Sequence, residues 1–166
     1  MGLACAGKTT LSNLFAQRVR EAGHPCVVLN SPNTRKVFGT NLGYDLTSRR
    51  KQTKRMLGLA EMIAGQDIVT IVSLIHPIEE DRQACRKTIP GYFEVYLKCS
   101  LDELMRRDAR ELYIAALRGK KKNVIGMDLP FEEPKASDLV LESDKLNPSN
   151  LVEALWKRTS HLLSAN

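Results

Sequence analysis

The chain has 166 residues, of which 43% are hydrophobic and 27% are charged, and its formal net charge is +6. This length and composition predict one globular domain, residues 1–166, that is large enough to bury a hydrophobic core. The longest mainly apolar run, Ile68 to Ile75, excludes a membrane-spanning helix, and the N-terminus lacks the layout of a signal peptide. We therefore expect a cytoplasmic protein without a membrane partner.

The patterning predicts helices that alternate with strands. The predicted elements, in chain order, are a helix over 9–22, a strand over 26–29, a turn-rich stretch over 30–44, a helix capped by Ser48 that ends at Gly65, a strand over 68–75, a helix over 79–87, a strand over 93–97, a basic helix over 101–117, a strand over 139–141 and a terminal helix that begins at Asn147-Pro148. Such alternation predicts an α/β fold with a parallel sheet and helices on both faces.

The cysteines have no C-x-x-C spacing and lie in or near apolar runs. They are Cys5, Cys26, Cys85 and Cys99. These positions predict buried thiols in a reducing compartment and disfavour a disulfide framework or a zinc site.

The first residues carry the strongest motif of the chain. Gly2 to Thr9 fits G-x-x-x-x-G-K-[ST], a phosphate-binding loop, and it opens directly into the first predicted helix. Backbone N–H groups of such a loop converge on phosphate oxygens, Lys8 would span the β- and γ-phosphates of ATP, and Thr9 would offer its hydroxyl to Mg²⁺. The predicted nucleotide-binding residues are Gly2, Leu3, Ala4, Cys5, Ala6, Gly7, Lys8, Thr9 and Thr10. The alternative is an ordinary glycine-containing turn before a helix.

A loop of this kind normally follows a buried strand, and no strand precedes Gly2 in this sequence. A parallel sheet without its middle strand would leave unpaired backbone groups on two neighbours. We therefore expect an apolar strand of roughly ten residues upstream of Met1 in the native reading frame.

Basic residues gather in two clusters. One contains Arg49, Arg50, Lys51, Lys54 and Arg55, and the other contains Arg106, Arg107, Arg110, Arg118, Lys120, Lys121 and Lys122. Either could meet a polyphosphate or a nucleic acid, or could be a solvated helix face. A nucleic-acid partner is disfavoured because the few aromatic residues do not interleave with the basic ones.

Several short stretches resemble, in order, the motifs of one family. The motif "N-x-x-L-G-F-x-x-x-x-R" is similar to Asn41-Leu42-Gly43-Tyr44 with Arg49, and "S-F-I-S-P-Y…D-R" is similar to Ser73-Leu74-Ile75-His76-Pro77 with Asp81-Arg82. The motif "R-D-x-K-G-L-Y" is similar to Arg107-Asp108 with Leu112-Tyr113, and "G-I-D-x-P-Y-E" is similar to Gly126-Met127-Asp128 with Pro130-Phe131-Glu132. The stretches run over nearly the whole chain, and they are similar to those of adenylyl-sulfate kinases.

This resemblance implies a P-loop kinase-type three-layer sandwich that moves the γ-phosphoryl of ATP, with Mg²⁺, to the 3′-hydroxyl of adenylyl sulfate. It implies acceptor-binding positions at Arg35, Tyr44, Arg49, Gln52, Ile75 and His76. It also implies a mobile lid over about residues 101–126, in which Arg110 takes the place of a lid lysine. The catalytic candidates are Lys8, Arg110 and His76. Taken alone, Tyr44 is compatible with simple packing and Arg49 with a solvated helix face.

The chain departs from the family pattern on the acceptor side. The family's "D-G-D-N-x-x-R" is Asn30 to Arg35 here, without either carboxylate, one of which would position Mg²⁺ or accept a proton. The serine before proline is His76, a candidate base or a polar strand end. Cys5 stands where the family usually has glycine, and Val124 replaces an aromatic residue.

Several interpretations remain open. The chain is a diverged kinase for another small acceptor, a weak adenylyl-sulfate kinase, or an ATP-binding module without turnover that serves a regulatory or structural role. The expected partner is a small-molecule nucleotide, and a homodimer is compatible with the sequence.

Overall fold

The computed structural model describes residues 1–39 and 41–163. Its helices are α1 (Lys8–Glu21), α2 (Ser31–Val37), α3 (Leu46–Ala64), α4 (Glu79–Thr88), α5 (Leu101–Arg107), α6 (Leu112–Leu117) and α7 (Pro148–Leu163). Its strands are β1 (Cys26–Asn30), β2 (Val69–Ser73), β3 (Val95–Lys98) and β4 (Leu139–Glu142). The four strands predicted after the phosphate loop are all present, each within a few residues of its predicted range.

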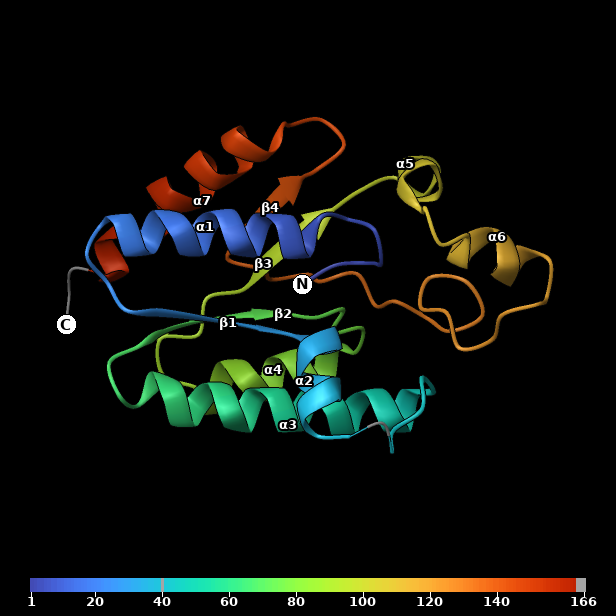
Figure 1. Ribbon diagram of the computed structural model, residues 1–166, viewed down its shortest axis with the longest axis horizontal. Coiled ribbons are helices and arrows are strands. Elements are labelled where there is room, and N and C mark those ends of the chain that lie inside the picture. Colours follow the sequence, from blue (N-terminus) through green and yellow to red (C-terminus); the bar gives the residue numbers. More distant parts are fainter. Residues whose placement is uncertain (40, 164–166) are drawn as a thin grey trace.

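The strands form a middle layer between two layers of helices. Helices α1 and α7 lie on one side of the strands, and α2, α3 and α4 lie on the other (Figure 1). Strand β1 pairs with β2 in parallel, and β3 pairs with β4 in parallel. This arrangement confirms the predicted α/β three-layer architecture.

The two strand pairs form separate sheets, and the first two residues connect them. The Met1 amine donates a hydrogen bond to the carbonyl oxygen of Val95 at 2.6 Å, and the Met1 carbonyl accepts one from the Leu97 N–H at 2.9 Å. The Gly2 N–H points the other way, toward the carbonyl oxygen of Ile75 at the end of β2. The start of the phosphate loop is therefore held between both pairs.

Two hydrophobic clusters fix the helices on the strands. The larger one joins α1, α7 and the β3–β4 pair, and its members with no exposed surface include Ala6, Ala16, Val19 and Leu104. The smaller one packs α3 against β1 and β2 around Met56, which is fully buried. Burial of a side chain of this size contributes roughly 1.5–3 kcal/mol.

Three predicted features are wrong at their boundaries. The predicted helix over 101–117 is two helices, because the Asp108 carboxylate accepts the Tyr113 N–H at 2.8 Å and Glu111 takes a left-handed conformation with φ of 53°. The stretch over 30–44 contains α2. Helix α3 is capped by Asp45 rather than Ser48, since the Asp45 carboxylate accepts the Ser48 N–H at 2.9 Å.

None of the helices in residues 1–39 and 41–163 has the length and apolarity that crossing a bilayer requires. The cysteines are free thiols, with Cys26 and Cys85 buried and Cys5 and Cys99 only partly so.

A buried arginine fixes the segment after β2. The Arg82 side chain is 2% exposed and forms an ion pair with Glu79. Its guanidinium also donates to the carbonyl oxygens of His76 and Glu132, each at 2.7 Å. Arg82 therefore ties α4 to the end of β2 and to a segment fifty residues further on.

We expect Arg82→Met to lower the free energy of unfolding by about 2–4 kcal/mol, because it leaves the buried His76 carbonyl and the Glu132 carbonyl without their donor and Glu79 without its partner. Arg50→Met is the matched control, since Arg50 pairs with Glu80 and Asp81 while its side chain is 41% exposed, and its loss should cost less than about 1 kcal/mol. Urea unfolding of both variants measures the difference. Equal losses would contradict the anchoring role.

Candidate functional site

The phosphate loop wraps the N-terminus of α1. Gly7 precedes the helix with φ of 88°, a left-handed conformation that glycine adopts without strain. No side chain caps this end, so the first N–H groups of the helix stay available. The free N–H groups and the helix dipole together favour an anion at this position.

Lys8 adds a positive charge to the loop. Its ammonium group donates a hydrogen bond to the Leu3 carbonyl, and burial lowers its pKa from 10.5 to about 8. No carboxylate in the described part of the chain forms an ion pair with Lys8. The charge is therefore not neutralised by the protein.

The hydroxyl groups that follow Lys8 have different surroundings. Thr9 and Thr10 are exposed on the first turn of α1, whereas Ser12 is buried and donates to the Lys8 carbonyl at 2.7 Å. The Thr9 hydroxyl is thus open to an oxygen-ligated cation that arrives with a nucleotide. The described residues contain no group of three or more His, Cys, Asp or Glu side chains that could hold a metal ion.

Two arginines and a tyrosine form a cluster at the start of α3. The guanidinium carbon of Arg35 lies 4.6 Å from the Tyr44 ring centre, and that of Arg49 lies 5.5 Å from it. Both guanidinium groups donate to backbone carbonyls, Arg35 to Leu42 at 2.8 Å and Arg49 to Asn123 at 2.9 Å. Burial and the positive charge of Arg35 lower the pKa of Arg49.

This arginine–tyrosine cluster has the groups that a nucleotide with an acidic substituent requires. Tyr44 is 54% exposed, so its ring is accessible to a flat group. Guanidinium groups that donate only to neutral carbonyls retain their full charge for an anion. The structure therefore brings together Arg35, Tyr44 and Arg49, which the sequence had placed in one acceptor site.

Gln52 and His76 lie inside the protein. Gln52 is 3% exposed, and its amide nitrogen donates to the Thr34 hydroxyl at 2.9 Å, which holds α2 against α3. His76 is 4% exposed and takes φ of 54°, and its Nε2 atom has no hydrogen-bond partner. Ile75, beside it, is partly buried and accepts the Gly2 N–H.

The environment of His76 opposes its charged form. Burial is the main cause, and the positive charges of Arg82 and of the Met1 ammonium group add to it, so the pKa falls from 6.5 to about 4. The carboxylates of Asp81 and Glu79 oppose this shift weakly. His76 is therefore neutral at neutral pH and shielded from solvent, and its assignment as a base stays a prediction.

Arg110 lies on the exposed link between α5 and α6. Its positive charge lowers the pKa of the Cys5 thiol, although burial and the Asp108 carboxylate dominate and raise that pKa overall. Arg110 is therefore close enough to the phosphate loop to act on it electrostatically.

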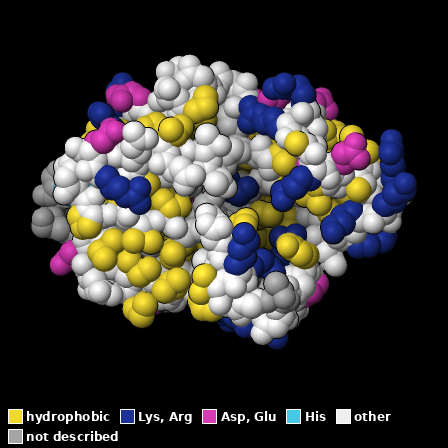
Figure 2. Space-filling view, in the orientation of Figure 1, with side chains coloured by type: hydrophobic (Ala, Val, Ile, Leu, Met, Phe, Trp, Pro, Cys, Tyr) yellow, Lys and Arg dark blue, Asp and Glu magenta, His cyan; other side chains and the backbone are white. Residues whose placement is uncertain are grey.

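A hollow opens beyond the carboxyl ends of β1 and β2, and lysine and arginine side chains surround it (Figure 2). Helices α2 and α3 lie below this region and α5 and α6 above it (Figure 1). Doubly wound α/β folds bind their ligands at this edge of the sheet.

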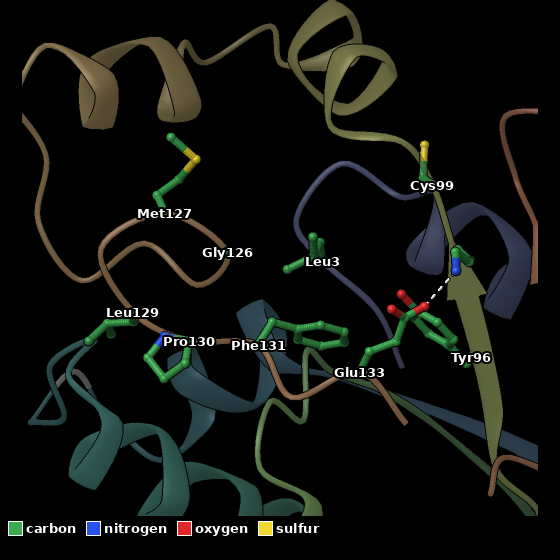
Figure 3. Close-up of a pocket in the computed structure, with 10 residues that line it drawn as sticks. Leu3, Tyr96, Cys99, Gly126, Met127, Leu129, Pro130, Phe131 and Glu133 are labelled. Carbon is green, nitrogen blue, oxygen red and sulfur yellow. Dashed lines mark hydrogen bonds and ion pairs between the residues drawn. The ribbon is translucent and has the colours of Figure 1, made fainter. Parts of the chain in front are cut away.

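A separate cavity of about 420 Å³ lies beside the loop, between the end of β3 and the segment 126–133. Figure 3 shows Leu3 of the phosphate loop among its lining residues, with Phe131 and Tyr96 on one side and Met127 on the other. Lys98 and Glu133 form an ion pair at 2.6 Å in its wall. None of the charged residues predicted to bind nucleotide or acceptor lines this cavity.

Sequence reasoning missed the two residues that join the lid region to the phosphate loop. Tyr113 donates its hydroxyl to the Ala4 carbonyl at 2.9 Å, and Asp108 accepts the Cys5 thiol at 3.7 Å. Both belong to matched family stretches, which was the only available signal, but more than a hundred positions separate them from the loop.

Parallel strand pairs between two helical layers, with a G-x-x-x-x-G-K-[ST] loop at the N-terminus of the first helix, define a P-loop nucleotide-binding protein. The family model for adenylylsulphate kinase matches residues 1–142. The chain therefore belongs to the adenylylsulphate kinase family.

Individual relatives agree with this assignment. The chain is 34% identical over 164 residues to the adenylyl-sulfate kinase of Paraburkholderia xenovorans, covering 98% of this chain and 90% of the relative. It is 30% identical over 161 residues to a probable adenylyl-sulfate kinase of Pyrococcus abyssi, covering 97% and 92%. The solved Mycobacterium tuberculosis APS kinase CysC, in complex with AMPPNP and APS, superimposes with a TM-score of 0.90 at 27% identity, covering 96% and 94%.

We expect stability to depend on pH through His76. The native imidazole stays neutral down to about pH 4, whereas the unfolded one takes up a proton near 6.5, so the unfolded state binds more protons between these values. The free energy of unfolding should fall by about 3 kcal/mol as pH drops through this window. The Met1 amine, whose pKa burial lowers from 8.0 to about 5, adds a fall that begins at higher pH.

His76→Asn tests this, because asparagine tolerates the left-handed backbone and does not titrate. Urea unfolding between pH 7.5 and 5 should show a shallower fall below about pH 6.5 in the variant. His161→Asn, at an exposed position on α7, is the control and should leave the wild-type slope intact. A slope that persists in His76→Asn would contradict the assignment.

Proposed function

We propose that the chain is an ATP-dependent phosphotransferase that moves the γ-phosphoryl group of ATP to a hydroxyl group of adenylyl sulfate or a related small nucleotide. The observation that carries the proposal is the pairing of two cationic sites, the phosphate loop with Lys8 and the arginine–tyrosine cluster. Among the residues that the structure describes, no carboxylate lies within hydrogen-bond distance of the cationic groups at either site. Two anionic reactants would each find a site.

The donor side accounts for most of the chemistry. Lys8 and the N–H groups of the loop would hold the β- and γ-phosphates and balance the charge that develops as the phosphoryl group transfers. Arg110, on the link between α5 and α6 in a lid over about 101–126, would close over the same oxygens. Mg²⁺ would neutralise phosphate charge when bound, with the exposed Thr9 hydroxyl as one oxygen ligand.

The acceptor side would be organised by the arginine–tyrosine cluster. Arg35 and Arg49 would grip acidic oxygens of the acceptor, and the Tyr44 ring would stack on its base. His76 stays the candidate base, and water or a phosphate oxygen would take the proton if the buried imidazole does not. Positioning and charge neutralisation supply most of the rate in phosphoryl transfer, so this arrangement is compatible with turnover.

The second candidate function is an ATP-binding module without turnover. It is favoured by the structural role of Asn30, whose side chain caps α2 by accepting the Asn33 N–H at 2.9 Å. No carboxylate occurs between Asn30 and Arg35 to accept a proton. Binding of Mg-ATP without ADP release from any acceptor would support this second function.

We expect Lys8→Ala to weaken binding of Mg-ATP about 10- to 100-fold, because it removes a charge-assisted hydrogen bond to phosphate. Isothermal titration calorimetry measures the affinity, and ADP release with a panel of nucleotides that includes adenylyl sulfate measures turnover. Lys157→Ala, on the exposed face of α7, is the control. Unchanged ATP affinity in Lys8→Ala would exclude this use of the loop.

We expect Arg49→Met to raise KM for the acceptor about 10-fold or more and to leave the affinity for ATP within about twofold, since it removes one bidentate anion contact from the acceptor side only. Arg50→Met is the control, because the neighbouring guanidinium is directed toward Glu80 and Asp81. Steady-state kinetics with the acceptor that gives the fastest ADP release distinguishes the two. Equal effects of both changes would contradict a specific acceptor role for Arg49.

A further inference from the structure

The segment between α5 and α6 touches the phosphate loop at two adjacent residues. The Tyr113 hydroxyl donates to the carbonyl oxygen of Ala4 at 2.9 Å, and Tyr113 has no exposed surface. Asp108 is 7% exposed, and its two carboxylate oxygens accept the Tyr113 N–H at 2.8 Å and the Cys5 thiol at 3.7 Å. One buried cluster, Asp108–Tyr113–Cys5, therefore joins the two segments.

We infer that Tyr113 and Asp108 are positioning residues that hold the phosphate loop in the shape that binds ATP, with the Cys5 thiol as the contact from the loop. The inference rests on the proposed function, since it assumes that this loop binds the phosphates of ATP.

One hydrogen bond to the Ala4 carbonyl fixes the direction of a backbone N–H group that can bind phosphate. A peptide unit is planar and trans, so its C=O and its N–H point in opposite directions. Once the Ala4 oxygen is held by Tyr113, the Cys5 N–H is turned to the opposite side of that peptide. The preceding peptide is held in the same way, because Lys8 donates to the Leu3 carbonyl.

Cys5 needs this support more than a glycine would. Its φ is 62°, in the left-handed region that carries an energetic penalty for residues with a Cβ atom. The contact with Asp108 offsets part of that penalty. Burial and the Asp108 charge also raise the pKa of the Cys5 thiol, which keeps the proton on sulfur and the thiol as the donor.

Through the same contacts, the position of the link between α5 and α6 affects the affinity of the phosphate loop for the nucleotide. Asp108 ends α5, and its carboxylate accepts the N–H of Tyr113 on the first turn of α6. A displacement of this link would break the hydrogen bond to Ala4. The loop shape and the position of the link are thus coupled by contacts that neither segment makes alone.

Tyr113→Phe is the direct test, because it removes only the hydroxyl group. We expect the dissociation constant for Mg-ATP, measured by calorimetry, to rise about 5- to 10-fold, the effect of one lost hydrogen bond. Tyr92→Phe is the matched control, since the Tyr92 hydroxyl donates to Glu94 at 2.8 Å. It should lower the melting temperature by a similar amount without changing the affinity for Mg-ATP.

A pair of substitutions at Cys5 tests the other contact and does not depend on Tyr113→Phe folding well. Both variants keep a Cβ atom at the left-handed position, but only serine can donate to Asp108. Cys5→Ser should bind Mg-ATP within about twofold of the wild type, and Cys5→Ala should bind it about 3- to 5-fold more weakly. Equal affinities in the two variants would remove Cys5 from the proposal.

The outcomes separate this inference from the proposed function. If Tyr113→Phe binds Mg-ATP like the wild type while Lys8→Ala does not, the loop binds ATP and the positioning role is wrong. If Tyr92→Phe weakens binding as much as Tyr113→Phe does, the effect is one of general stability and the inference fails. If Lys8→Ala also binds normally, the proposed function itself fails.

Discussion

The close approach of Gly2 to β3 is the constraint on which the site depends. A Cβ atom at Gly2 would lie 2.5 Å from the Leu97 carbonyl oxygen, so only glycine fits. The Gly2 N–H is at the same time directed to Ile75 at the end of β2. The loop therefore leaves the gap between the two strand pairs at a fixed point, and α1 starts where its N–H groups face the carboxyl edge of both pairs.

The position at which the phosphate loop begins determines which other segments can lie next to it. The segment after β2 is held by Arg82, and the start of α3 is held by the bond from Arg49 to the Asn123 carbonyl. Arg49 thereby joins the arginine–tyrosine cluster to the segment over residues 101–126. The two cationic sites are consequently held by contacts with residues far along the sequence, the phosphate loop by Ile75 and Leu97 and the arginine–tyrosine cluster by Asn123.

Local patterns were sufficient for the loop, the strands and most helices, because glycine spacing and apolar periodicity are properties of neighbouring residues. Contacts between distant residues were not accessible in this way. The break at Asp108 depends on a carboxylate that caps α6 and reaches Cys5, and a basic, helix-forming stretch gives no sign of it. The burial of His76 depends likewise on Arg82 and on the segment around Glu132. From the sequence alone, a histidine before proline indicates a polar strand end or a candidate base.

The stretch from Asn30 to Arg35 contains no carboxylate and forms the start of α2. Asn30 caps α2 with its side chain, and a proline in the first turn suits a position where no N–H donor is required. This helix start carries Arg35 to the Tyr44 ring. A stretch without carboxylates therefore still places the Arg35 guanidinium over an exposed aromatic ring. Since phosphoryl transfer depends more on positioning and charge balance than on a protein base, the proposed function does not require a carboxylate in this stretch.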